Sequence, residues 1–466
     1  MSIHIYNSLS KTKEEFVPLD AKNVTMYSCG VTVYDQCHIG HARSLYIFDI
    51  IKRYLRYRGF HVHFVRNITD VDDKIINKAK ELKQTSDEVA SAHIALYQKD
   101  LQSLGIAQAD DEPRATGNIP EMITHIEALI QKDYAYPMDG DVYFKVRRFN
   151  EYGKLSGQSI DQMLEGVRIE PDARKKDPLD FALWKKSSDE EPGWSSPWGR
   201  GRPGWHIECS CMSMKYLKTQ TLDIHAGGRD LIFPHHENEI AQSESLTGKP
   251  FAKVWIHHGL LTIRGQKMAK SLKNFITIQE VLKKYSADEL KFLFLSSHYA
   301  SPVDFTDEKM NEAHKALERI KILIKRAASR GKSKIGEPKK SHDEEKKFID
   351  EYKQKFIMAM DDDFNTPQAL ACLFDLVTQT NRCLDRGFEV ASDAVETIKE
   401  LCSNIFGLSF DRPQDKLSED VEGLLSERKN ARANKDFKRC DELRHLLKVK
   451  GILVEDTKEG QVWRRE

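Results

Sequence analysis

The sequence predicts an α/β fold of the Rossmann nucleotide-binding type with an insertion, followed by an α-helical bundle and a small C-terminal α+β domain. Three observations lead to this prediction. A strand, a Gly-containing loop, a helix and a second strand follow one another over residues 24–67, which is the order of a parallel strand–helix–strand unit. Beyond Asp288 the apolar residues recur at helical spacing almost throughout. Residues 451–465 then read as two short strands around a Lys-Glu-Gly turn.

The first strand and helix meet at a pair of histidines. Residues 24–28 read as the end of a buried strand, and apolar residues at helical spacing run from Leu45 until Gly59 stops them. His38-Ile39-Gly40-His41 falls where this helix begins, with its unpaired N–H groups and the positive end of its dipole. Two imidazoles, with a glycine between them that lets a ligand approach the backbone, indicate a phosphate site.

A lone H-x-G-H motif is more often an accident of sequence in an ordinary loop. This chain also contains Lys267-Met268-Ala269-Lys270-Ser271, in a polar loop that follows an apolar run. The two motifs together are far rarer by chance than either alone.

The second strand, residues 61–67, places polar side chains just beyond its carboxyl end. Ligands of open parallel sheets bind beyond those ends. Four side chains here are candidates to contact a substrate: Thr69, Asp70, Asp72 and Asp73. For Asp72 and Asp73 an equally good interpretation is that they cap the helix that begins near Lys74.

The middle of the chain reads as an insertion and then as the second half of the nucleotide fold. Helical spacing ends near residue 130, and residues 134–149 have a strand pattern. We expect an insertion over residues 123–199, which runs into the irregular Gly- and Pro-rich stretch W-S-S-P-W-G-R-G-R-P-G-W. Strand signals resume at residues 221–225 and 254–258, and Pro234 suits the first turn of a helix through Ile240. The charged stretch 329–346 reads as a solvated loop or a short disordered link between helices.

Composition limits the class of protein. The 466 residues suggest roughly three domains of about 150 residues each. Lysine plus arginine equal aspartate plus glutamate at 72 each, so any RNA contact must come from a local basic patch. No apolar run approaches the roughly 18 residues of a membrane span, and the N-terminus lacks the order of a signal peptide. We therefore expect a cytoplasmic protein with no membrane partner, and the eight scattered cysteines favour reduced thiols, some of them metal ligands.

The paired motifs resemble a known family. H-I-G-H followed by K-M-A-K-S is similar to the HIGH and KMSKS signatures of class I aminoacyl-tRNA synthetases. Longer segments resemble the cysteinyl-tRNA synthetases among them: C-G-V-T-V-Y-D from Cys29, N-I-T-D-V-D-D-K-I from Asn67, G-R-P-G-W-H-I-E-C from Gly201, D-I-H-A-G-G-R-D from Asp223 and F-P-H-H-E-N-E from Phe233. D-D-F-N-T-P from Asp362 and the region 428–463 also match, so the resemblance covers essentially the whole chain.

The resemblance implies a class I synthetase-type Rossmann fold divided into six segments. Residues 1–122 and 200–260 would form the two halves of the catalytic domain, with 123–199 as a connective insertion. Residues 261–315 would carry the K-M-A-K-S loop and a region that contacts the tRNA stem, 316–405 a helical bundle, and 406–466 the anticodon-binding domain. The implied activity is ATP-dependent ligation of L-cysteine to tRNA(Cys) through a cysteinyl-adenylate, by an enzyme that we expect to be a monomer.

The resemblance also implies one zinc ion per chain, held by Cys29, Cys209, His235 and Glu239. Thiolate, imidazole and carboxylate groups are all zinc ligands, and tetrahedral coordination needs four. His235 and Glu239 lie four apart on an expected helix, so both project from one face. From the residues alone, five neighbours compete for the role: Cys37, Cys211, His206, His225 and His236. His236 lies roughly 100° from His235 around the helix, so both would not comfortably share one ion.

Zinc gives a physical reason for selecting cysteine. A substrate thiol that coordinates zinc is deprotonated, and neither a serine hydroxyl nor an alanine methyl can match that bond. Pockets that exclude by size separate near neighbours by only about 1 to 3 kcal/mol, whereas a site satisfied by one specific group rejects others by roughly 10,000-fold. We therefore expect no separate editing site. The resemblance places four residues in the amino-acid pocket: Thr69, Trp205, His225 and Asp230. Of these, Asp230 is best placed to receive an ammonium group, and Trp205 could equally belong to the core.

The formation of the aminoacyl-adenylate determines which groups the two motifs must supply. A carboxylate attacks the α-phosphate of ATP while pyrophosphate leaves, so the protein must supply positioned positive groups. We expect His38 and His41, with Gly40 between them, to bind the phosphates, and Lys267 and Lys270 to neutralise the leaving pyrophosphate. Mg²⁺ bound to ATP would share that work. By resemblance, Lys270 ranks highest for ATP binding.

The K-M-A-K-S loop departs from the family at two positions. Ala269 replaces the usual serine of the signature, and Lys273 stands where the family commonly has glycine. Both lysines and Ser271 remain, so activity should survive. The two departures would affect the mobility of the loop.

The candidate RNA contact is the basic run over residues 428–450, which holds nine lysines and arginines against three acidic residues. By itself such a run is more often a solvated helix face. Its place in a separate terminal domain, with Phe437 and Trp463 available to stack on bases, suits a single-stranded RNA loop, and the family uses this region for the anticodon.

Three alternatives to a cysteine-charging enzyme are open. An enzyme that joins activated cysteine to an amino sugar shares the catalytic half but lacks the C-terminal portion. A nucleotidyltransferase that uses H-x-G-H alone would not need four metal ligands. A zinc-stabilised RNA-binding protein without activity would have no reason to keep His38, His41 and Lys270.

Overall fold

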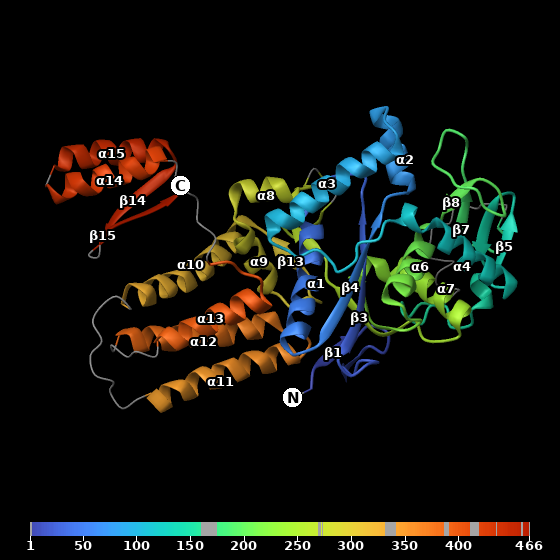
Figure 1. Cartoon of the computed structure of the whole chain (residues 1–466), viewed down its shortest axis with the longest axis horizontal. Coiled ribbons are helices and arrows are strands. Elements are labelled where there is room, and N and C mark those ends of the chain that lie inside the picture. The colour runs from blue at the N-terminus through green and yellow to red at the C-terminus, as the bar shows by residue number, and fades with distance from the viewer. Residues whose placement is uncertain are drawn as a thin grey trace. The chain divides into compact units, whose positions relative to one another are not determined.

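The computed structural model describes residues 2–159, 175–268, 272, 274–330, 342–385, 391–410, 419–434, 436–457 and 460–465. The chain divides into two compact units, Met1–Leu408 and Ser409–Glu466. The first holds a parallel sheet with flanking helices and then a set of long helices, and the second pairs two helices with two strands (Figure 1). This confirms the predicted α/β fold with helical and α+β parts after it.

The centre of the first unit is a four-stranded parallel sheet in the order β10-β9-β3-β4. Its strands are β3 (Asn23–Thr32), β4 (His61–Thr69), β9 (Leu222–Gly228) and β10 (Ala252–His258). Tyr27 of β3 pairs with Val65 on one side and with His225 on the other. Because all four strands run in the same direction, their carboxyl ends meet at one edge, where ligands of such sheets bind.

Strand β3 is irregular between Ser28 and Val31, at the point where it carries Cys29. Gly30 explains the irregularity. Its N–H donates to Asn67 Oδ1 at 2.8 Å, and a Cβ at this position would lie 1.6 Å from the Asn67 carbonyl oxygen. Only glycine fits where two backbones approach this closely.

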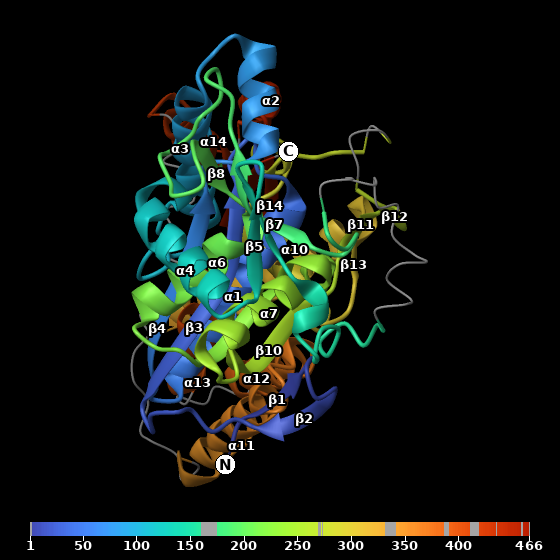
Figure 2. The same ribbon diagram turned by 90° about the vertical axis from the view of Figure 1, so that its right-hand side faces the viewer.

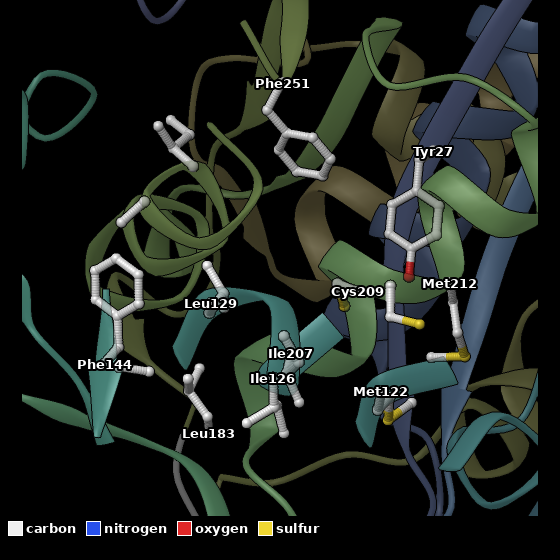
Figure 3. Close-up of a cluster of buried hydrophobic side chains, with 14 of the residues drawn as sticks. Tyr27, Met122, Ile126, Leu129, Phe144, Leu183, Ile207, Cys209, Met212 and Phe251 are labelled. Carbon is white, nitrogen blue, oxygen red and sulfur yellow. The ribbon is translucent and has the colours of Figure 1, made fainter. Parts of the chain in front are cut away.

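Helices cover the sheet and close its core. α1 (Ile39–Tyr57) joins β3 to β4, and its buried face includes Leu45 and Phe48, as the spacing predicted. α2 (Asp73–Leu82), α3 (Ser86–Leu104) and α4 (Ile119–Gln131) follow, and α6 (Trp205–Leu217) and α7 (Glu237–Thr247) flank the second half. Figure 3 shows apolar side chains of α4 and α6 gathered beside Tyr27 of β3.

The helix expected from Pro234 is preceded by a kink. Phe233 has an extended backbone (φ −135°, ψ 132°) and is the one residue of Ile232–His236 with a non-helical conformation, so helical backbone resumes at Pro234, as predicted. It continues directly into the regular helix α7, which begins at Glu237 and runs through Ile240.

The insertion carries an antiparallel sheet in the order β5-β6-β7-β8 (Figure 2). Its strands are β5 (Ala135–Met138), β6 (Asp141–Phe144), β7 (Phe181–Lys186) and β8 (Gly201–Pro203). The strands expected within residues 134–149 are confirmed. The Gly- and Pro-rich stretch is not irregular throughout, because β8 pairs with β7 at the edge of this sheet, a position where proline is tolerated.

A small sheet and two helices follow the parallel sheet. Strands β11 (Leu261–Ile263), β12 (Gln266–Lys267) and β13 (Val303–Phe305) form the sheet in the order β12-β11-β13, and α8 (Ile278–Lys284) and α9 (Ala287–Leu295) lie between β12 and β13 in sequence. At the N-terminus, β1 (His4–Asn7) pairs with β2 (Thr12–Glu15).

Four further helices follow in the first unit: α10 (Asp307–Arg330), α11 (His342–Asp361), α12 (Thr366–Asp385) and the shorter α13 (Ala391–Glu400). The charged stretch expected to be a loop over 329–346 is shorter, since α10 continues to Arg330 and α11 begins at His342. Residues 331–341 lie outside the described part of the chain.

The terminal unit consists of α14 (Glu419–Ala433), α15 (Phe437–Val449) and the antiparallel pair β14 (Ile452–Thr457) and β15 (Gly460–Arg465). The two strands predicted around the Lys-Glu-Gly turn are confirmed. All eight cysteines of the chain are free thiols. Within the described ranges, no helix has both the length and the apolar character needed to cross a membrane.

Candidate active site

The paired histidines begin α1 and fix each other's orientation. His38 is the N-cap residue, and the His41 N–H donates to its Nδ1 at 3.2 Å. The His38 N–H donates in return to His41 Nδ1 at 3.3 Å, and the two rings stack with their centroids 3.7 Å apart. Because each Nδ1 accepts a backbone hydrogen, each neutral ring carries its own proton on Nε2. Burial, helped by the charges of His38 and Lys74, lowers the pKa of His41 to about 3, so this ring is a neutral donor at physiological pH.

These histidines face a pocket of about 490 Å³ at the carboxyl edge of the parallel sheet. Its lining includes seven residues singled out from the sequence: Cys29, His38, Gly40, His41, Trp205, Asp230 and Lys267. A Cβ at Gly40 would lie 2.9 Å from the His38 ring and 3.3 Å from Met268 Cε. The structure therefore brings the two distant motifs to one pocket and leaves no space for a side chain between them.

The K-M-A-K-S segment is described only in part. Lys267 ends β12 and is exposed, and its carbonyl oxygen accepts a hydrogen bond from Asn274 Nδ2 at 3.1 Å. Lys270 lies outside the described residues, as do Ala269, Ser271 and Lys273. The part played by Lys270 stays a prediction from the sequence.

A group that we call the donor cluster consists of Cys29, Cys209, His235 and Glu239. One potential ligand atom of each residue lies within 4.8 Å of the others. His235 Nε2 is 2.9 Å from Glu239 Oε1 and 3.5 Å from Cys209 Sγ, and Cys29 Sγ is 3.3 Å from Glu239 Oε1. These residues come from β3, α6, the turn before α7 and α7 itself, so the fold brings together side chains that are distant along the chain.

The donor cluster has the chemistry of a zinc site. Burial raises the pKa of the Cys29 thiol, and Cys209 and Glu239 raise it further because anionic groups would crowd one point. Burial would also raise the pKa of Cys209, but the hydrogen bond with Cys29 and the charge of His235 outweigh it and lower this pKa to about 6. A divalent cation would relieve the crowding, and two thiols, an imidazole and a carboxylate are donors that zinc accepts. The four residues therefore fit a zinc ion.

Two competing histidines approach the donor cluster from another side. His225 and His236 form, with Cys29 and Glu239, a second group whose ligand atoms also lie within 4.8 Å of one another. His236 Nε2 lies 3.3 Å from Cys29 Sγ, although spacing had set it apart from His235. Neither group contains both His235 and His236, which agrees with the expectation that the two would not share one ion.

The other competitors lie farther out. Among the described residues, Cys37, Cys211 and His206 belong to neither group of potential ligands. His206 Nδ1 lies 2.9 Å from His235 Nδ1. Since His235 turns its Nε2 toward Glu239, a partner at Nδ1 fixes the orientation of the ring, as outer partners of metal-binding histidines do.

Two residues of the expected amino-acid pocket face its open side. Trp205 is 38% exposed and stacks on His235 with the ring centroids 4.1 Å apart, so it is not an ordinary core residue. Asp230 is exposed and lines the same pocket as the paired histidines.

The other two residues lie behind the donors. His225 is fully buried, and its Nε2 lies 2.8 Å from Glu239 Oε2, so it orients that carboxylate. Thr69 is buried at the end of β4, and its hydroxyl donates to Glu208 Oε2 at 2.8 Å.

The acidic residues after β4 have structural partners. Asp72 is the N-cap of α2 and accepts the Lys74 N–H at 2.9 Å, which confirms the capping interpretation for this residue. Asp73 lies 2.7 Å from Lys185 Nζ and 2.5 Å from Arg202 Nη2, so it ties α2 to the insertion.

Two residues near the phosphate-facing part of the pocket were missed by the sequence analysis. Lys74 lines the pocket, and its ammonium lies 5.4 Å from the Tyr34 ring centroid. The sequence feature that could have identified Lys74 is the motif N-I-T-D-V-D-D-K-I, which contains it. Arg43 follows H-I-G-H-A and is buried, and a charged residue on the apolar face of a helix was the signal there.

Much of the basic run in the terminal unit is engaged inside that unit. Buried Arg428 lies 2.8 Å from Asp456 Oδ2, and Arg432 and Arg444 contact the same carboxylate. Arg439 pairs with Glu427 and Glu442, and Lys450 with Asp420. Of these cations only Arg428 is buried, whereas the side chains of Arg432, Arg439, Arg444 and Lys450 are 41–47% exposed. Most of the run therefore still faces solvent, although several of its charges have partners within the unit. Phe437 is 64% exposed. The structure does not describe the side chain of Trp463.

Comparisons with known proteins cover the whole chain. Residues 15–315 match the family model of the tRNA synthetases class I (C) catalytic domain, residues 355–411 that of the DALR domain, and residues 414–464 that of the cysteinyl-tRNA ligase anticodon binding domain. The chain is 47% identical over 472 residues to the cysteine–tRNA ligase of Halalkalibacterium halodurans and 48% identical over 493 residues to that of Persephonella marina, and 100% of each chain is covered. Its structure is similar to Mycobacterium tuberculosis methionyl-tRNA synthetase in complex with methionyl-adenylate, with a TM-score of 0.67, 14% identity, and 84% of this chain and 92% of that one covered. This last likeness concerns the fold alone.

Proposed function

The chain belongs to the cysteine–tRNA ligase family of class I aminoacyl-tRNA synthetases, enzymes that charge tRNA with cysteine, and on this premise we propose how its residues carry out that reaction. Cysteine and ATP react to cysteinyl-adenylate, the cysteinyl group passes to tRNA(Cys), and one zinc ion selects the substrate thiol. The supporting observation is that Cys29 belongs both to the donor cluster and to the pocket lined by His38 and His41.

The zinc ion would be held by Cys29, Cys209, His235 and Glu239. When bound, zinc supplies a site where a thiol is held as thiolate, which serine and alanine cannot match. His225 holds the Glu239 carboxylate and His206 holds the His235 ring, so the donors are oriented before substrate arrives. Selection by one specific bond makes a separate editing site unnecessary.

The rest of the amino acid would be bound by four residues around the donor cluster. The exposed carboxylate of Asp230 receives the ammonium group. Trp205, which stacks on His235, covers the carbon chain of the substrate. Thr69, at the end of β4, and His225, in the middle of β9, close the site from behind.

The phosphate-facing residues would then promote attack of the cysteine carboxylate on the α-phosphorus of ATP, with pyrophosphate as the leaving group. His38 and His41 donate to the phosphates through Nε2, and Gly40 keeps the approach to the helix open. Lys267 and Lys270 balance the charge of the leaving pyrophosphate, together with Mg²⁺ that arrives on ATP.

The remaining segments would serve the tRNA. We assign residues 1–122 and 200–260 to catalysis, 123–199 to the connective insertion, and 261–315 to the K-M-A-K-S loop and stem contact. Residues 316–405 form the helical bundle and 406–466 bind the anticodon, in an enzyme that acts as a cytoplasmic monomer. The match of residues 414–464 to the anticodon binding domain supports the last assignment.

The test is ATP–pyrophosphate exchange that depends on cysteine, measured together with the zinc content of the same preparation. We expect exchange with cysteine but not with serine, one zinc ion per chain, and charging of tRNA(Cys). RNA binding without any exchange would instead support an inactive RNA-binding protein, and transfer of cysteine to an amino sugar but not to tRNA would support the related sugar-modifying enzyme.

A further inference from the structure

One arginine joins the two motif-bearing parts of the pocket. Arg43 lies in the first turns of α1, two residues after His41, and is 1% exposed. Its guanidinium donates to four backbone carbonyls: Nη1 to Gly259 at 2.6 Å and Leu260 at 2.8 Å, and Nη2 to Tyr299 at 3.3 Å and Ser301 at 2.5 Å. Burial lowers the pKa of Arg43 to about 10, so it is still charged at neutral pH.

The four carbonyls belong to two connections that pack on each other. Gly259 and Leu260 follow β10, line the pocket and lead through β11 to Lys267. Residues 299–301 precede β13, the parallel neighbour of β11. The Gly259 N–H donates to the Tyr299 carbonyl at 2.9 Å, and a Cβ at Gly259 would lie 2.4 Å from the Ser301 oxygen. The connections therefore form one wall. α1 contacts β11 and α9, and Figure 1 shows α1 beside α9.

We propose that Arg43 is a positioning residue for ATP, because it fixes the distance between the paired histidines on α1 and the pocket wall at residues 259–261. The planar guanidinium has five donors, and it alone among side chains can serve four carbonyls from one buried position. No carboxylate pairs with Arg43 in the described part of the chain, so this charge is balanced by backbone dipoles of the wall.

Removal of the guanidinium would take one hydrogen bond from each of the four carbonyls. The Leu260 and Tyr299 carbonyls keep the N–H groups of Val303 and Gly259, and the Gly259 carbonyl keeps His258 Nδ1. The Ser301 carbonyl loses the donor that Arg43 supplies, and the combined loss is unfavourable enough to move the wall. The histidines would then no longer lie opposite the backbone that carries the chain to Lys267. The donor cluster is not attached to this wall through Arg43, so the thiol-selecting side should keep its geometry. This inference rests on the proposed function, since it takes ATP to be the ligand of the pocket.

The test measures KM for ATP and KM for cysteine in pyrophosphate exchange by the full-length, zinc-containing Arg43→Lys variant. We expect KM for ATP to rise at least tenfold, with KM for cysteine and the zinc content unchanged. Arg58→Lys is the matched control, because Arg58 lies at the other end of α1 and pairs with Asp361. It should lower the melting temperature and leave both KM values as they are.

A second variant, Arg43→Ala, covers the case in which lysine does not support folding. Millimolar guanidinium ion should restore its exchange by filling the vacated site, whereas urea should not. An equal change in both KM values, a lower melting temperature with an unchanged KM for ATP, or no rescue by guanidinium would each reduce Arg43 to a structural residue. If the unaltered enzyme shows no cysteine-dependent exchange, the proposed function itself fails. If the unaltered enzyme does show exchange, the results above concern Arg43 alone.

Discussion

The two sides of the proposed active site are built differently: the donor cluster, which we propose selects the thiol, and the side with the paired histidines, which we propose faces the phosphates. In the donor cluster Cys209, His235 and Glu239 are fully buried, and each is held by neighbouring side chains. On the other side, His38 and His41 hold each other through their Nδ1 atoms, while Lys267 is exposed on a short strand. A buried, preorganised site suits the selection of one small group, and an open site lined by donors suits a large anion that arrives from solvent.

The largest effect should come from breaking the preorganised side. We expect Glu239→Ala to lose zinc and to reduce discrimination of cysteine against serine from roughly 10,000-fold to the 10- to 200-fold that size exclusion allows. Activation of both amino acids, measured by pyrophosphate exchange alongside metal content, checks this. Glu244→Gln, on the same helix α7, should change neither. Unchanged discrimination in a zinc-free Glu239→Ala protein would contradict the zinc hypothesis.

The second prediction concerns the effect of acid on the side with the paired histidines. Burial lowers the pKa of His41 to about 3 and that of His258 to about 4, from an ordinary 6.5. At pH values between each lowered pKa and 6.5, the unfolded chain binds more protons than the folded chain. The stability that these neutral histidines contribute is therefore complete above pH 6.5 and is lost as pH falls. For His41 we expect a loss of about 3 kcal/mol in the free energy of unfolding on going from pH 6.5 to pH 4.

Urea unfolding at a series of pH values measures this loss. His41→Asn should flatten the fall in stability, and His61→Asn, which changes an exposed histidine at the start of β4, should not. If the free energy of unfolding falls with pH at the same slope in the unaltered protein and in both variants, His41 titrates normally.

A smaller effect is expected at the lysines of the K-M-A-K-S motif. Lys270→Ala should slow pyrophosphate exchange by at least tenfold, or about 1.4 kcal/mol of transition-state stabilisation, with zinc content and cysteine discrimination intact. Lys253→Ala, on the surface of β10, serves as the control. An unaltered rate would remove Lys270 from the mechanism.

The smallest effect should come from the terminal unit, which belongs to neither side. Phe437→Ala should raise KM for tRNA by about fivefold, near the lower end of what a stacked base contributes, and leave exchange without tRNA unchanged. Val449→Ala removes another exposed apolar side chain from α15 and should alter neither value. Equal effects of the two variants would rule out a specific stacking role for Phe437.

The sequence was most informative where periodicity or spacing has a direct geometric meaning. The spacing of Leu45 and Phe48 predicted the buried face of α1, and the four-residue separation of His235 and Glu239 placed both at one point, 2.9 Å apart. The convergence of Cys29 and Cys209 with them depended on the family resemblance, because no local pattern relates β3 to α6.

Sequence reasoning failed where the partner is backbone or is distant along the chain. Arg43 binds four carbonyls, and a carbonyl is present at every position, so no residue type identifies its partners. In the basic run, Asp456 of β14 accepts from arginines of two helices, a pairing that forms only when α14 and α15 both pack beside β14.

The central claim is that the donor cluster holds a metal ion that binds the substrate thiol directly. Cobalt(II), which accepts the same donors, can replace zinc and reports sulfur ligation through its near-ultraviolet charge-transfer absorption. We predict that L-cysteine, but not L-serine, intensifies the sulfur-to-cobalt charge-transfer band of the substituted protein. A spectrum that cysteine leaves unchanged would contradict the account.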